Sequence, residues 1–374
     1  MFCTLSVVSG QKNDAWKVGQ RNDYANTTIK VLLDRCAQRL DLQYLSVDPI
    51  EVRGDNRVTL LAAKRLQLLW LAKNSLQLNG QRVEAGVIQL VPPSPSTTVR
   101  YASRIYRGSL WVYPDTKGMM VVNELPIEEY LVGTLAGEMS PSWELEALKA
   151  QAVASRSFAA YCKRHPRSTR YHVDSTVKDQ VFVGSAIESA QLLAAVRATT
   201  GLLLTLNAQP LQAFFHSRCG GVTQDAEAVW SHSPKGAMVS VNCPYCYRNP
   251  VRWQIDIAHN DLRKAFGFPQ VASQSPPFGL SADRRLSGRI QSITMTEQGK
   301  KVTIAADKLR AKVGYGRLKS AVFDWQRKPA TTTFFGTGFG HGVGLCQWGA
   351  RYLAQQGKTF REILVYYYPK AEIK

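Results

Sequence analysis

The sequence lacks several features that would narrow its function at once. No apolar run approaches the roughly 18 residues that a membrane-spanning helix needs. No arginine-rich arm, Lys/Arg block, zinc-finger or RNA-recognition signature occurs, so we do not expect nucleic acid as a partner. Seven cysteines in 374 residues are too few for a disulfide-built scaffold, and their odd number leaves at least one outside any pairing within the chain.

Acidic residues are also scarce relative to basic ones. Lys and Arg number 47 against 28 Asp and Glu, which leaves a formal net charge of +19. A charge of that size favours polyanionic neighbours, and without nucleic-acid signatures these are anionic lipids or acidic cell-wall polymers. Hydrophobic residues make up 45% of the chain, so it can bury a substantial core, and its length predicts two domains or one domain with a large insertion.

The first part of the chain predicts short strands. Runs rich in β-branched and apolar residues are separated by turn signals such as Gly54-Asp55-Asn56 and Asn79-Gly80. The strands expected here and just beyond are Ile29–Leu33, Val58–Ala62, Leu66–Trp70, Val83–Leu90, Val99–Tyr106, Ser109–Tyr113 and Met119–Asn123.

A helical pattern begins after residue 140. Residues Glu144–Lys163 contain no Gly or Pro and place Leu145 and Leu148 at helical spacing. Ser140 and Pro141 are the expected N-cap and first helical residue. Further expected helices are Ala186–Thr200, Asn260–Phe266, Gln347–Gln355 and one opened by a Thr359–Glu362 capping box, and further expected strands are Leu202–Phe215, Ile290–Thr296 and Lys301–Ile304.

Glu138 is the carboxylate whose surroundings suggest chemistry. A helix start just after it would lower its pKa, whereas apolar neighbours such as Met139 and Trp143 would raise it through partial desolvation. If desolvation dominates, the group is protonated near neutral pH and can act as a general acid. Otherwise Glu138 simply stabilises a helix start, and the local pattern leaves both interpretations open.

Three blocks of sequence, in the same order, resemble the stage II sporulation protein D and amidase-enhancer family. Two long matches separated by about 200 residues are a specific signal, and the shorter block fits between them. The blocks are Leu125–Tyr161, which contains Glu138-Met139, then His216–Thr223 with Trp230, and finally Thr337–Ala350, followed by Gln356–Thr359 and Tyr366–Pro369.

The resemblance implies a peptidoglycan lytic transglycosylase with Glu138 as its general acid/base. The implied reaction cleaves the β-1,4 bond between N-acetylmuramic acid and N-acetylglucosamine, leaves 1,6-anhydro ends, and acts on glycan stripped of stem peptides by an amidase. One carboxylate suffices because the sugar's own C6 hydroxyl attacks, so no second carboxylate has to activate water. The alternative is a non-catalytic glycan-binding activator of a cell-wall amidase, as the amidase-enhancer branch suggests.

The expected strands and helices predict an α+β fold, and the resemblance implies a location. We expect a mixed-sheet catalytic domain of short helices, a strand-rich N-terminal region and a second, smaller lobe. The expected parts are a strand-rich region at 1–99, the catalytic core at 100–250 and 331–374, and an inserted lobe at 251–330. The implied location is the cell envelope, periplasmic or on the extracytoplasmic face, although Met1–Gly10 is weakly apolar and shows no evident export signal.

Five residues besides Glu138 are candidates for substrate binding. Arg156 lies 18 positions later on the predicted helix, where it faces the site or forms a surface ion pair. Ser217 and Gln347 are hydrogen-bonding candidates for sugar hydroxyl or acetamido groups, and Gln180 matches a family position. His341 lies in an alternation of glycines that lets the backbone approach a ligand closely, yet it is equally compatible with a structural role.

A metal-like pattern is the second chemical signal. His216-x-x-Cys219 and Cys243-x-x-Cys246 offer four ligands in two short clusters, a spacing suited to tetrahedral zinc. Such zinc would be structural, and no cofactor is expected for catalysis. A Cys219–Cys243 disulfide and free thiols are the alternatives, and the role of Cys346, where the family usually has Ser or Thr, stays open.

Overall fold

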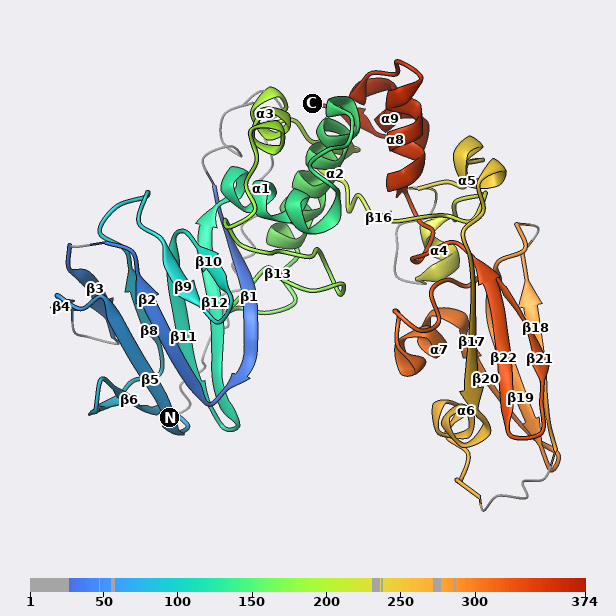
Figure 1. Ribbon diagram of the computed structural model, residues 1–374, viewed down its shortest axis with the longest axis horizontal. Coiled ribbons are helices and arrows are strands. Elements are labelled where there is room, and N and C mark those ends of the chain that lie inside the picture. The colour runs from blue at the N-terminus through green and yellow to red at the C-terminus, as the bar shows by residue number, and fades with distance from the viewer. Residues whose placement is uncertain are drawn as a thin grey trace, which may run out of the picture.

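A computed structural model describes residues 27–46, 48–54, 58–230, 236, 238–271, 277–285 and 287–374. It contains helices and strands in several separate sheets, so the predicted α+β class is confirmed. Figure 1 shows the N-terminal strands beneath a group of helices, and a second, separate group of strands formed by later residues. Met1–Gly10 and the turn residues Asp55 and Asn56 lie outside the described residues, within which no helix has the length and apolarity to cross a bilayer.

Two sheets make up the N-terminal body. The first has, in spatial order, β13 (Val173–Asp174), β1 (Thr28–Ala37), β12 (Gly118–Pro126), β11 (Ser109–Asp115), β8 (Ile88–Val91), β3 (Ile50–Arg53) and β4 (Val58–Leu61). The second has β10 (Arg104–Tyr106), β9 (Val99–Tyr101), β2 (Arg39–Tyr44), β5 (Arg65–Ala72), β6 (Ser75–Leu78) and β7 (Gln81–Glu84). The first sheet is mixed, because β1 pairs antiparallel with β12 and parallel with β13. The N-terminal strands therefore share one sheet with chain beyond residue 100.

The structure contradicts three strand predictions, because none of the ranges is one continuous strand. These are Val83–Leu90, Val99–Tyr106 and Leu202–Phe215. Val83–Leu90 is interrupted at residues 85–87, and its two halves belong to different sheets. Val99–Tyr106 and Leu202–Phe215 are interrupted by tight turns, with Ala102 (φ 53°) and Asn207 (φ 50°) in the left-handed conformation that such turns require. The last of them becomes β14 (Leu204–Leu206), β15 (Gln209–Pro210) and β16 (Phe215–His216). β14 also pairs with β24 (Glu372–Ile373), and β16 pairs in parallel with β23 (Leu345–Cys346). Short apolar runs alone do not show where a chain reverses.

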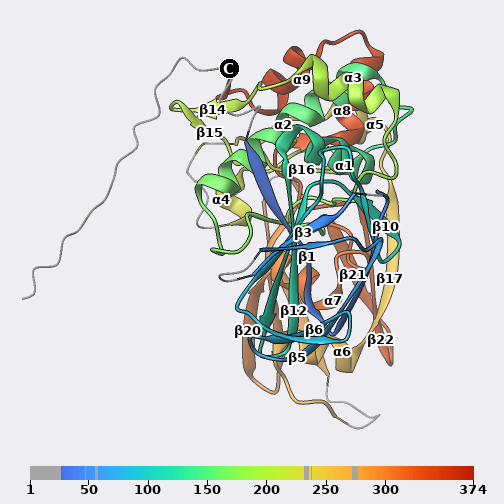
Figure 2. The ribbon, with the colours of Figure 1, turned by 90° about the vertical axis from the view of Figure 1, so that its left-hand side faces the viewer.

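The helices pack around one central, almost fully buried helix, α2. They are α1 (Ile127–Glu138), α2 (Leu145–Arg164), α3 (Ala190–Ala198), α8 (Gln347–Gln355) and α9 (Phe360–Tyr367). α2 contacts the other four, and its many alanines let their backbones approach closely. Figures 1 and 2 both show α8 and α9, from the C-terminal end, beside α2. The predicted helix Gln347–Gln355 and the Thr359–Glu362 capping box are confirmed.

The start of α2 differs from the prediction. Ser140 and Pro141 are not its N-cap and first residue, because the Ser140 hydroxyl accepts the backbone N–H of Ser142 in a separate turn. α2 begins at Leu145, with Glu144 as its N-cap. The helix predicted over Ala186–Thr200 is shorter, since the Ser189 side chain caps α3 at its N-terminus.

The second lobe has a hydrophobic core of its own, formed by residues between Trp253 and Phe334. Its elements are β17 (Arg252–Ala258), α6 (His259–Phe266), β18 (Phe278–Arg284), β19 (Ile290–Glu297), β20 (Lys300–Ala305), α7 (Ala306–Val313), β21 (Phe323–Arg327) and β22 (Thr331–Thr337). Two short helices, α4 (Ala226–Val229) and α5 (Pro244–Arg248), precede it. β17 and β22 pair antiparallel with Arg252 opposite Thr337, so the chain enters and leaves the lobe side by side.

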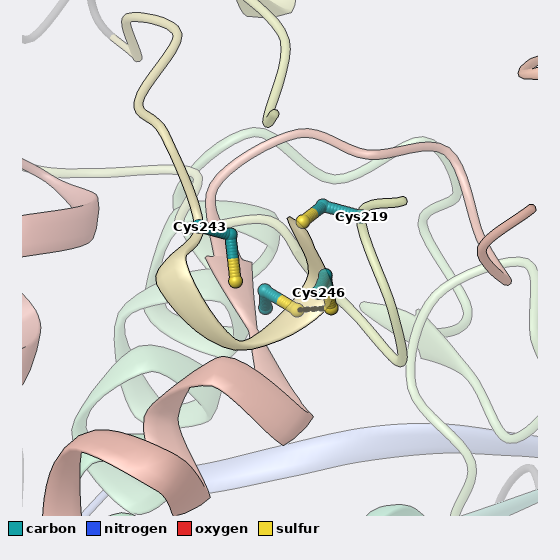
Figure 3. A group of neighbouring side chains, drawn as sticks. Cys219, Cys243 and Cys246 are labelled. Atoms are coloured by element: carbon teal, nitrogen blue, oxygen red, sulfur yellow. Dashed lines mark hydrogen bonds between the residues drawn. The ribbon is translucent and has the colours of Figure 1, made fainter. Parts of the chain in front are cut away.

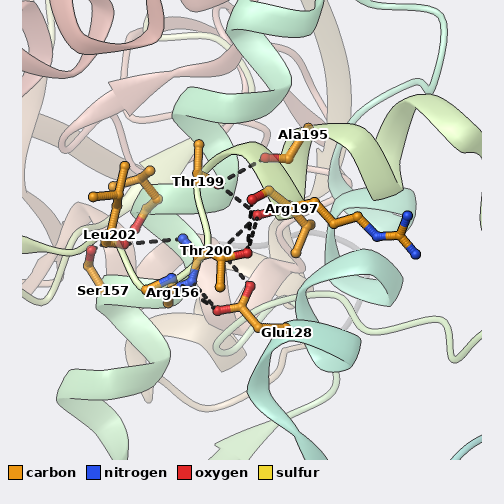
Figure 4. A network of polar contacts seen from close by, with 11 residues as sticks. Glu128, Arg156, Ser157, Ala195, Arg197, Thr199, Thr200 and Leu202 are labelled. Atoms are coloured by element: carbon orange, nitrogen blue, oxygen red, sulfur yellow. Dashed lines mark hydrogen bonds and ion pairs between the residues drawn. The ribbon is translucent and has the colours of Figure 1, made fainter. Parts of the chain in front are cut away.

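Arg156 holds three parts of the main body together (Figure 4). Its guanidinium makes two hydrogen bonds to Glu128 of α1, at 2.8 and 2.7 Å, and a third to the Leu202 carbonyl at 3.1 Å. The side chain is completely buried. These partners occupy Arg156 inside the helix cluster, so the structure gives it a structural role in place of the predicted contact with substrate.

We expect Glu128→Gln to destabilise the protein by about 3 kcal/mol, the low end of the range for breaking a buried ion pair, because Glu128 itself is partly exposed. The amide keeps the size of the side chain but leaves the Arg156 cation buried without an anion. Chemical denaturation followed by circular dichroism measures the change. Asp41→Asn, which breaks the exposed Arg39–Asp41 pair, is the control and should unfold like the unmodified protein. Equal curves for both variants would show that Arg156 needs no counter-ion.

Candidate active site

Glu138 is the last residue of α1, not the residue before a helix start. Met139 follows in an extended conformation as the C-cap, and α2 begins only after a turn. The sequence-based prediction of a pKa-lowering helix start just after Glu138 was therefore wrong. The carboxylate lies at the negative end of the α1 dipole, where ionisation is disfavoured, and the last turn of α1 carries no basic residue.

Two glycines of α1 bring a neighbouring loop onto this carboxylate. A Cβ at Gly137 would lie 2.6 Å from the Val181 carbonyl oxygen, and one at Gly133 would lie 2.5 Å from the Gly184 carbonyl oxygen. With only hydrogen at these positions, residues 181–184 lie directly against one face of the helix. The Val181 backbone N–H then donates to Glu138 Oε1 over 2.8 Å.

Gln347 holds the other carboxylate oxygen. It is the buried first residue of α8, and its Nε2 donates to Glu138 Oε2 over 3.3 Å. Ser217 lies at the same helix start, because its carbonyl accepts the Trp348 N–H at 3.2 Å. The structure therefore brings Glu138, Gln347 and Ser217 together from three distant segments, and the positive end of α8 partly opposes the field of α1.

Burial raises the pKa of Glu138 above its usual value, and the hydrogen bonds from Val181 and Gln347 lower it by less. No charged side chain in the described part of the chain contributes to this shift. Protein atoms surround the carboxyl group on most sides, yet its side chain keeps partial contact with solvent. A partly exposed carboxyl that resists ionisation can deliver a proton to a bound oxygen and take one back.

Aromatic and cationic side chains lie beside this position. Trp348 follows Gln347, and its ring lies 5.0 Å from that of Trp143 and, stacked, 6.0 Å from that of Tyr245. The Arg218 guanidinium covers the Trp348 ring at 3.7 Å. These rings are partly exposed, except for buried Trp143. Such a surface offers flat apolar ring faces and hydrogen-bond donors to a ligand.

Two predicted substrate-binding residues have their polar atoms occupied elsewhere. Gln180 is completely buried, accepts the Tyr130 hydroxyl at 2.7 Å and donates to the Ser155 carbonyl. His341 accepts the Val343 N–H on Nδ1 and donates from Nε2 to the Phe215 carbonyl at 2.9 Å. Burial lowers the pKa of His341 well below its usual value, so the ring is neutral. Their positions indicate structural roles in place of the predicted contacts with substrate.

Four cysteines form a compact cluster (Figure 3), and one of them directly precedes Gln347 of the candidate site. The sulfurs of Cys219, Cys243, Cys246 and Cys346 all lie within 4.8 Å of one another, and all four residues are buried. Tetrahedral zinc with Zn–S bonds of about 2.3 Å places its ligand sulfurs roughly 3.8 Å apart, so this set fits the ion. The sulfurs of Cys246 and Cys346 lie 3.5 Å apart, too far for a disulfide. Cys219 and Cys243 are also free cysteines, which excludes the predicted Cys219–Cys243 disulfide in this structure.

The predicted ligand set was wrong in one member. His216 is not part of the cluster, because its Nδ1 contacts the Val343 carbonyl at 3.0 Å, and burial lowers its pKa to about 3. Cys346, whose role the sequence left open, takes the fourth position. It lies opposite His216 in the β16–β23 pair, so the two residues are adjacent and sequence spacing could not distinguish them.

The surroundings of the cluster suit thiolates. Hydrogen bonds from neighbouring thiols lower the pKa of Cys243, whereas burial raises the pKa of Cys346. The Gly221 N–H donates to Cys219 Sγ at 3.3 Å, and the Tyr367 hydroxyl lies 3.5 Å from Cys243 Sγ. A Cβ at Gly349 would lie 2.7 Å from the Cys243 sulfur and collide with the Tyr367 hydroxyl. All four cysteines are buried, an arrangement typical of structural zinc sites and not of catalytic ones.

Comparison with known proteins agrees with this architecture. A family model described as Stage II sporulation protein matches residues 115–206, and a Domain of unknown function (DUF8618) matches residues 247–344. The first match contains the helices around Glu138, and the second covers the separate lobe.

Three relatives are similar over most of the chain. An uncharacterized protein of Brachyspira hyodysenteriae is 34% identical over 270 residues, 72% of each chain. Stage II sporulation protein D of Bacillus subtilis is 34% identical over 272 residues, 67% of this chain and 75% of the relative. The amidase enhancer of Bacillus subtilis is 27% identical over 288 residues, 64% of this chain and 39% of the relative. By these matches the chain belongs to the stage II sporulation protein D family.

Proposed function

We propose that this protein is a peptidoglycan lytic transglycosylase with Glu138 as its only acid/base. The observation that supports the proposal is a carboxyl group held by two neutral donors, with a raised pKa and no charged side chain among the described residues acting on it. Glycosidases that use water need two carboxyl groups roughly 5 to 9.5 Å apart. A reaction in which the substrate supplies its own nucleophile needs only one.

Protonated Glu138 would donate its proton to the glycosidic oxygen as the bond to the muramic-acid anomeric carbon breaks. The carboxylate so formed would take the proton of the C6 hydroxyl as that oxygen bonds to the same carbon. One proton is given and one returned, so Glu138 ends as it began and no water is consumed. Tethering of the C6 hydroxyl within the sugar replaces the positioning of an external nucleophile.

The remaining site residues would orient Glu138 and the glycan. The Val181 N–H and the Gln347 amide stabilise the carboxylate between the two steps, when it carries negative charge. Tyr245 and Trp348 offer partly exposed ring faces to sugar rings, and Ser217 offers a hydroxyl at the same helix start. The net charge of +19 favours attachment to anionic wall polymer. The substrate in turn implies an extracytoplasmic location.

A second candidate function is suggested by the similarity to a protein named amidase enhancer. In that case the site would bind glycan without cutting it and would stimulate a partner amidase. Glycan stripped by an amidase is also the proposed substrate, so an amidase is an expected partner under either function. The two are separated by the products formed by the isolated protein.

Glu138→Gln should abolish product formation, by at least about 10²-fold, the lower end expected for losing a general acid/base. Amidase-stripped glycan strands are incubated with each protein, and the products are separated and identified by mass spectrometry. Anhydro-muramic ends are expected from the unmodified protein, and from Glu146→Gln, a control that changes a partly exposed carboxylate of α2. Reducing ends would instead indicate a hydrolase, and no product from any protein, with glycan bound, would support the amidase activator.

Thermal unfolding at several pH values checks that the Glu138→Gln protein is folded. Because the folded-state pKa of Glu138 is raised, its ionised form is the less favourable one in the fold, and stability falls as pH rises through that pKa. The neutral amide avoids this loss. The variant should therefore be at least as stable as the unmodified protein at neutral pH, and the difference should vanish in acid.

Gln347→Leu should move the pH dependence of catalysis upward. Activity should fall as pH rises through the pKa of Glu138, because the first step requires the protonated acid. The Gln347 amide lowers that pKa by stabilising the carboxylate, so its loss raises the pKa and shifts the alkaline limb to higher pH. Measured kcat/KM profiles test this. An unshifted or downward-shifted limb would contradict the assignment of Glu138 as the titrating acid.

The four cysteines are proposed to hold one structural zinc ion. The buried, closed set fits a tetrahedral ion and excludes substrate, so the metal would stabilise the loops that carry Cys219 and Cys346 without taking part in the reaction. It would supply folding free energy through its thiolate ligands.

Cys346→Ser should weaken zinc binding by more than about 100-fold, since even residues that only support a ligand change affinity by 10 to 100-fold. His216→Gln is the matched control, because the sequence alone made His216 the fourth ligand, and it should retain the metal. Native mass spectrometry gives the metal content of each protein. If Cys346→Ser retained zinc and His216→Gln lost it, His216 and not Cys346 would be the fourth ligand. If the unmodified protein held no metal and its mass were lower by the two hydrogens of one disulfide, the zinc proposal would be wrong.

A further inference from the structure

The N-terminal strands contact the loop that donates a hydrogen bond to Glu138. This loop, residues 181–185, presents the Val181 N–H to the carboxylate and then runs to β10 of the second sheet. The Ser185 N–H donates to the Ile105 carbonyl of β10 over 2.8 Å, and the Ser185 hydroxyl donates to the same oxygen over 3.2 Å. Figures 1 and 2 both show β10 close to α1. The loop therefore lies between the helix that carries Glu138 and a strand of the N-terminal body.

A glycine on each side lets the loop fit between these two elements. On the side of α1, a Cβ at Gly133 would lie 2.6 Å from the Phe182 ring and 2.5 Å from the Gly184 carbonyl oxygen. On the side of β10, a Cβ at Gly184 would lie 2.2 Å from the Ile105 carbonyl oxygen, and Gly184 has φ 76°. Neither contact leaves room for a side chain, so the position of the loop depends on both elements.

Phe182 anchors the loop from inside. The residue is 1% exposed, and its ring lies 5.2 Å from that of Tyr130 on α1 and 6.0 Å from that of Tyr106 on β10. The backbone of Phe182 is also held, because its N–H donates to the Ser175 carbonyl over 3.1 Å. Burial of this ring keeps the loop against the body, and it leaves the orientation of the following peptide group to polar contacts.

Arg104 of β10 makes such a polar contact. Its Nη1 donates to the Phe182 carbonyl over 2.9 Å, and the Val183 N–H of the same peptide group donates to the Gly133 carbonyl over 3.3 Å. A hydrogen bond from a guanidinium is charge-assisted and so stronger than one between neutral groups. The peptide group after Phe182 is thus held from β10 and from α1, which fixes the direction of the backbone that begins with the Val181 N–H.

We propose that Arg104 is a positioning residue of the candidate active site, because it holds the loop that presents the Val181 N–H to Glu138. Arg104 acts through the Phe182 carbonyl, one residue beyond the donor. It precedes residues 115–206, which the family model matches, so the N-terminal strands contribute to the site from outside that match. The proposal rests on the proposed function only in giving this hydrogen bond a task in catalysis.

The titration of Glu138 reports on the position of the loop. The Val181 N–H stabilises the ionised carboxylate, so a displaced loop raises the pKa of Glu138 further. No charged side chain in the described part of the chain contributes to that pKa. Tyr130, a titratable group that interacts with Glu138, stays neutral because burial raises its pKa well above the usual value.

The test compares Arg104→Met with Arg100→Met in the full chain. Methionine keeps a long side chain but cannot donate a hydrogen bond. Arg100 is the matched control, because it is an exposed residue of β9 in the same sheet, opposite Ile105. Carboxyl-carbon NMR of protein labelled at its glutamate side chains follows the titration, and Glu138→Gln identifies the signal. In Arg104→Met the signal of Glu138 should titrate at higher pH, and in Arg100→Met it should titrate as in the unmodified protein.

Kinetics on amidase-stripped glycan give a second measurement. Arg104→Met should lower kcat by about threefold to tenfold, the change expected for loss of one hydrogen bond, and should leave KM unchanged because it alters no side chain that faces the glycan. If Arg104→Met does not fold, Gly184→Ala decides. Its added methyl group would push the loop away from β10, so the signal of Glu138 should again titrate at higher pH.

An unshifted titration of Glu138 in Arg104→Met would overturn the proposal, and so would an equal shift in Arg100→Met. Lower stability without a shifted titration would show that Arg104 is only structural. Because the NMR titration needs no turnover, it separates this proposal from the proposed function. A shifted titration in a protein that forms no anhydro product would contradict the transglycosylase and leave the positioning role of Arg104 in place.

Discussion

The start of α8 is the constraint on which both chemical features of the molecule depend. Cys346 and Gln347 are consecutive, yet Cys346 reaches the cysteine cluster and Gln347 reaches Glu138. The parallel pairing of β23 with β16 fixes their position, and Ser217 at the end of that pair holds the first turn of the helix through its carbonyl. A shift of α8 would therefore disturb both the cluster and the carboxylate. The cluster, although buried, therefore supports the position of the candidate active site.

Buried charge is handled in two ways in this protein. Arg156 in the main body and Arg263 in the lobe each face a carboxylate across a short ion pair, and each ties separate elements together. Arg289 of the lobe instead donates to the Cys219 and His341 carbonyls of the main body. Burial lowers its pKa to about 10, and the nearby thiols of Cys219 and Cys346 oppose that shift. The charge of Arg289 is thus compensated by the cysteine cluster and by carbonyl oxygens, and not by a carboxylate of the described residues.

The local sequence pattern correctly predicted the elements that depend on neighbouring residues. Helical spacing found α2, and the capping box found α9, because these depend on residues within a few positions of one another. The resemblance singled out Glu138, whose catalytic role stays a prediction, but it did not indicate that Glu138 is the last residue of α1. Long-range choices failed: Cys346, 100 positions from its neighbour Cys246, displaced His216, and Arg156 turned inward. The glycines of α1, four positions apart on one helical face, were a signal that could have indicated the loop at Val181.

The lobe begins and ends at directly paired residues, Arg252 and Thr337. A segment with adjacent ends can enter a gene as one cassette, since the host chain need only open at a single turn. The two bodies are nevertheless coupled, because Arg289 of the lobe donates to the carbonyls of Cys219 and His341. Removing the lobe would leave these two carbonyls without their donor, so a segment that is joined at one place in the fold also supports the loop that carries Cys219.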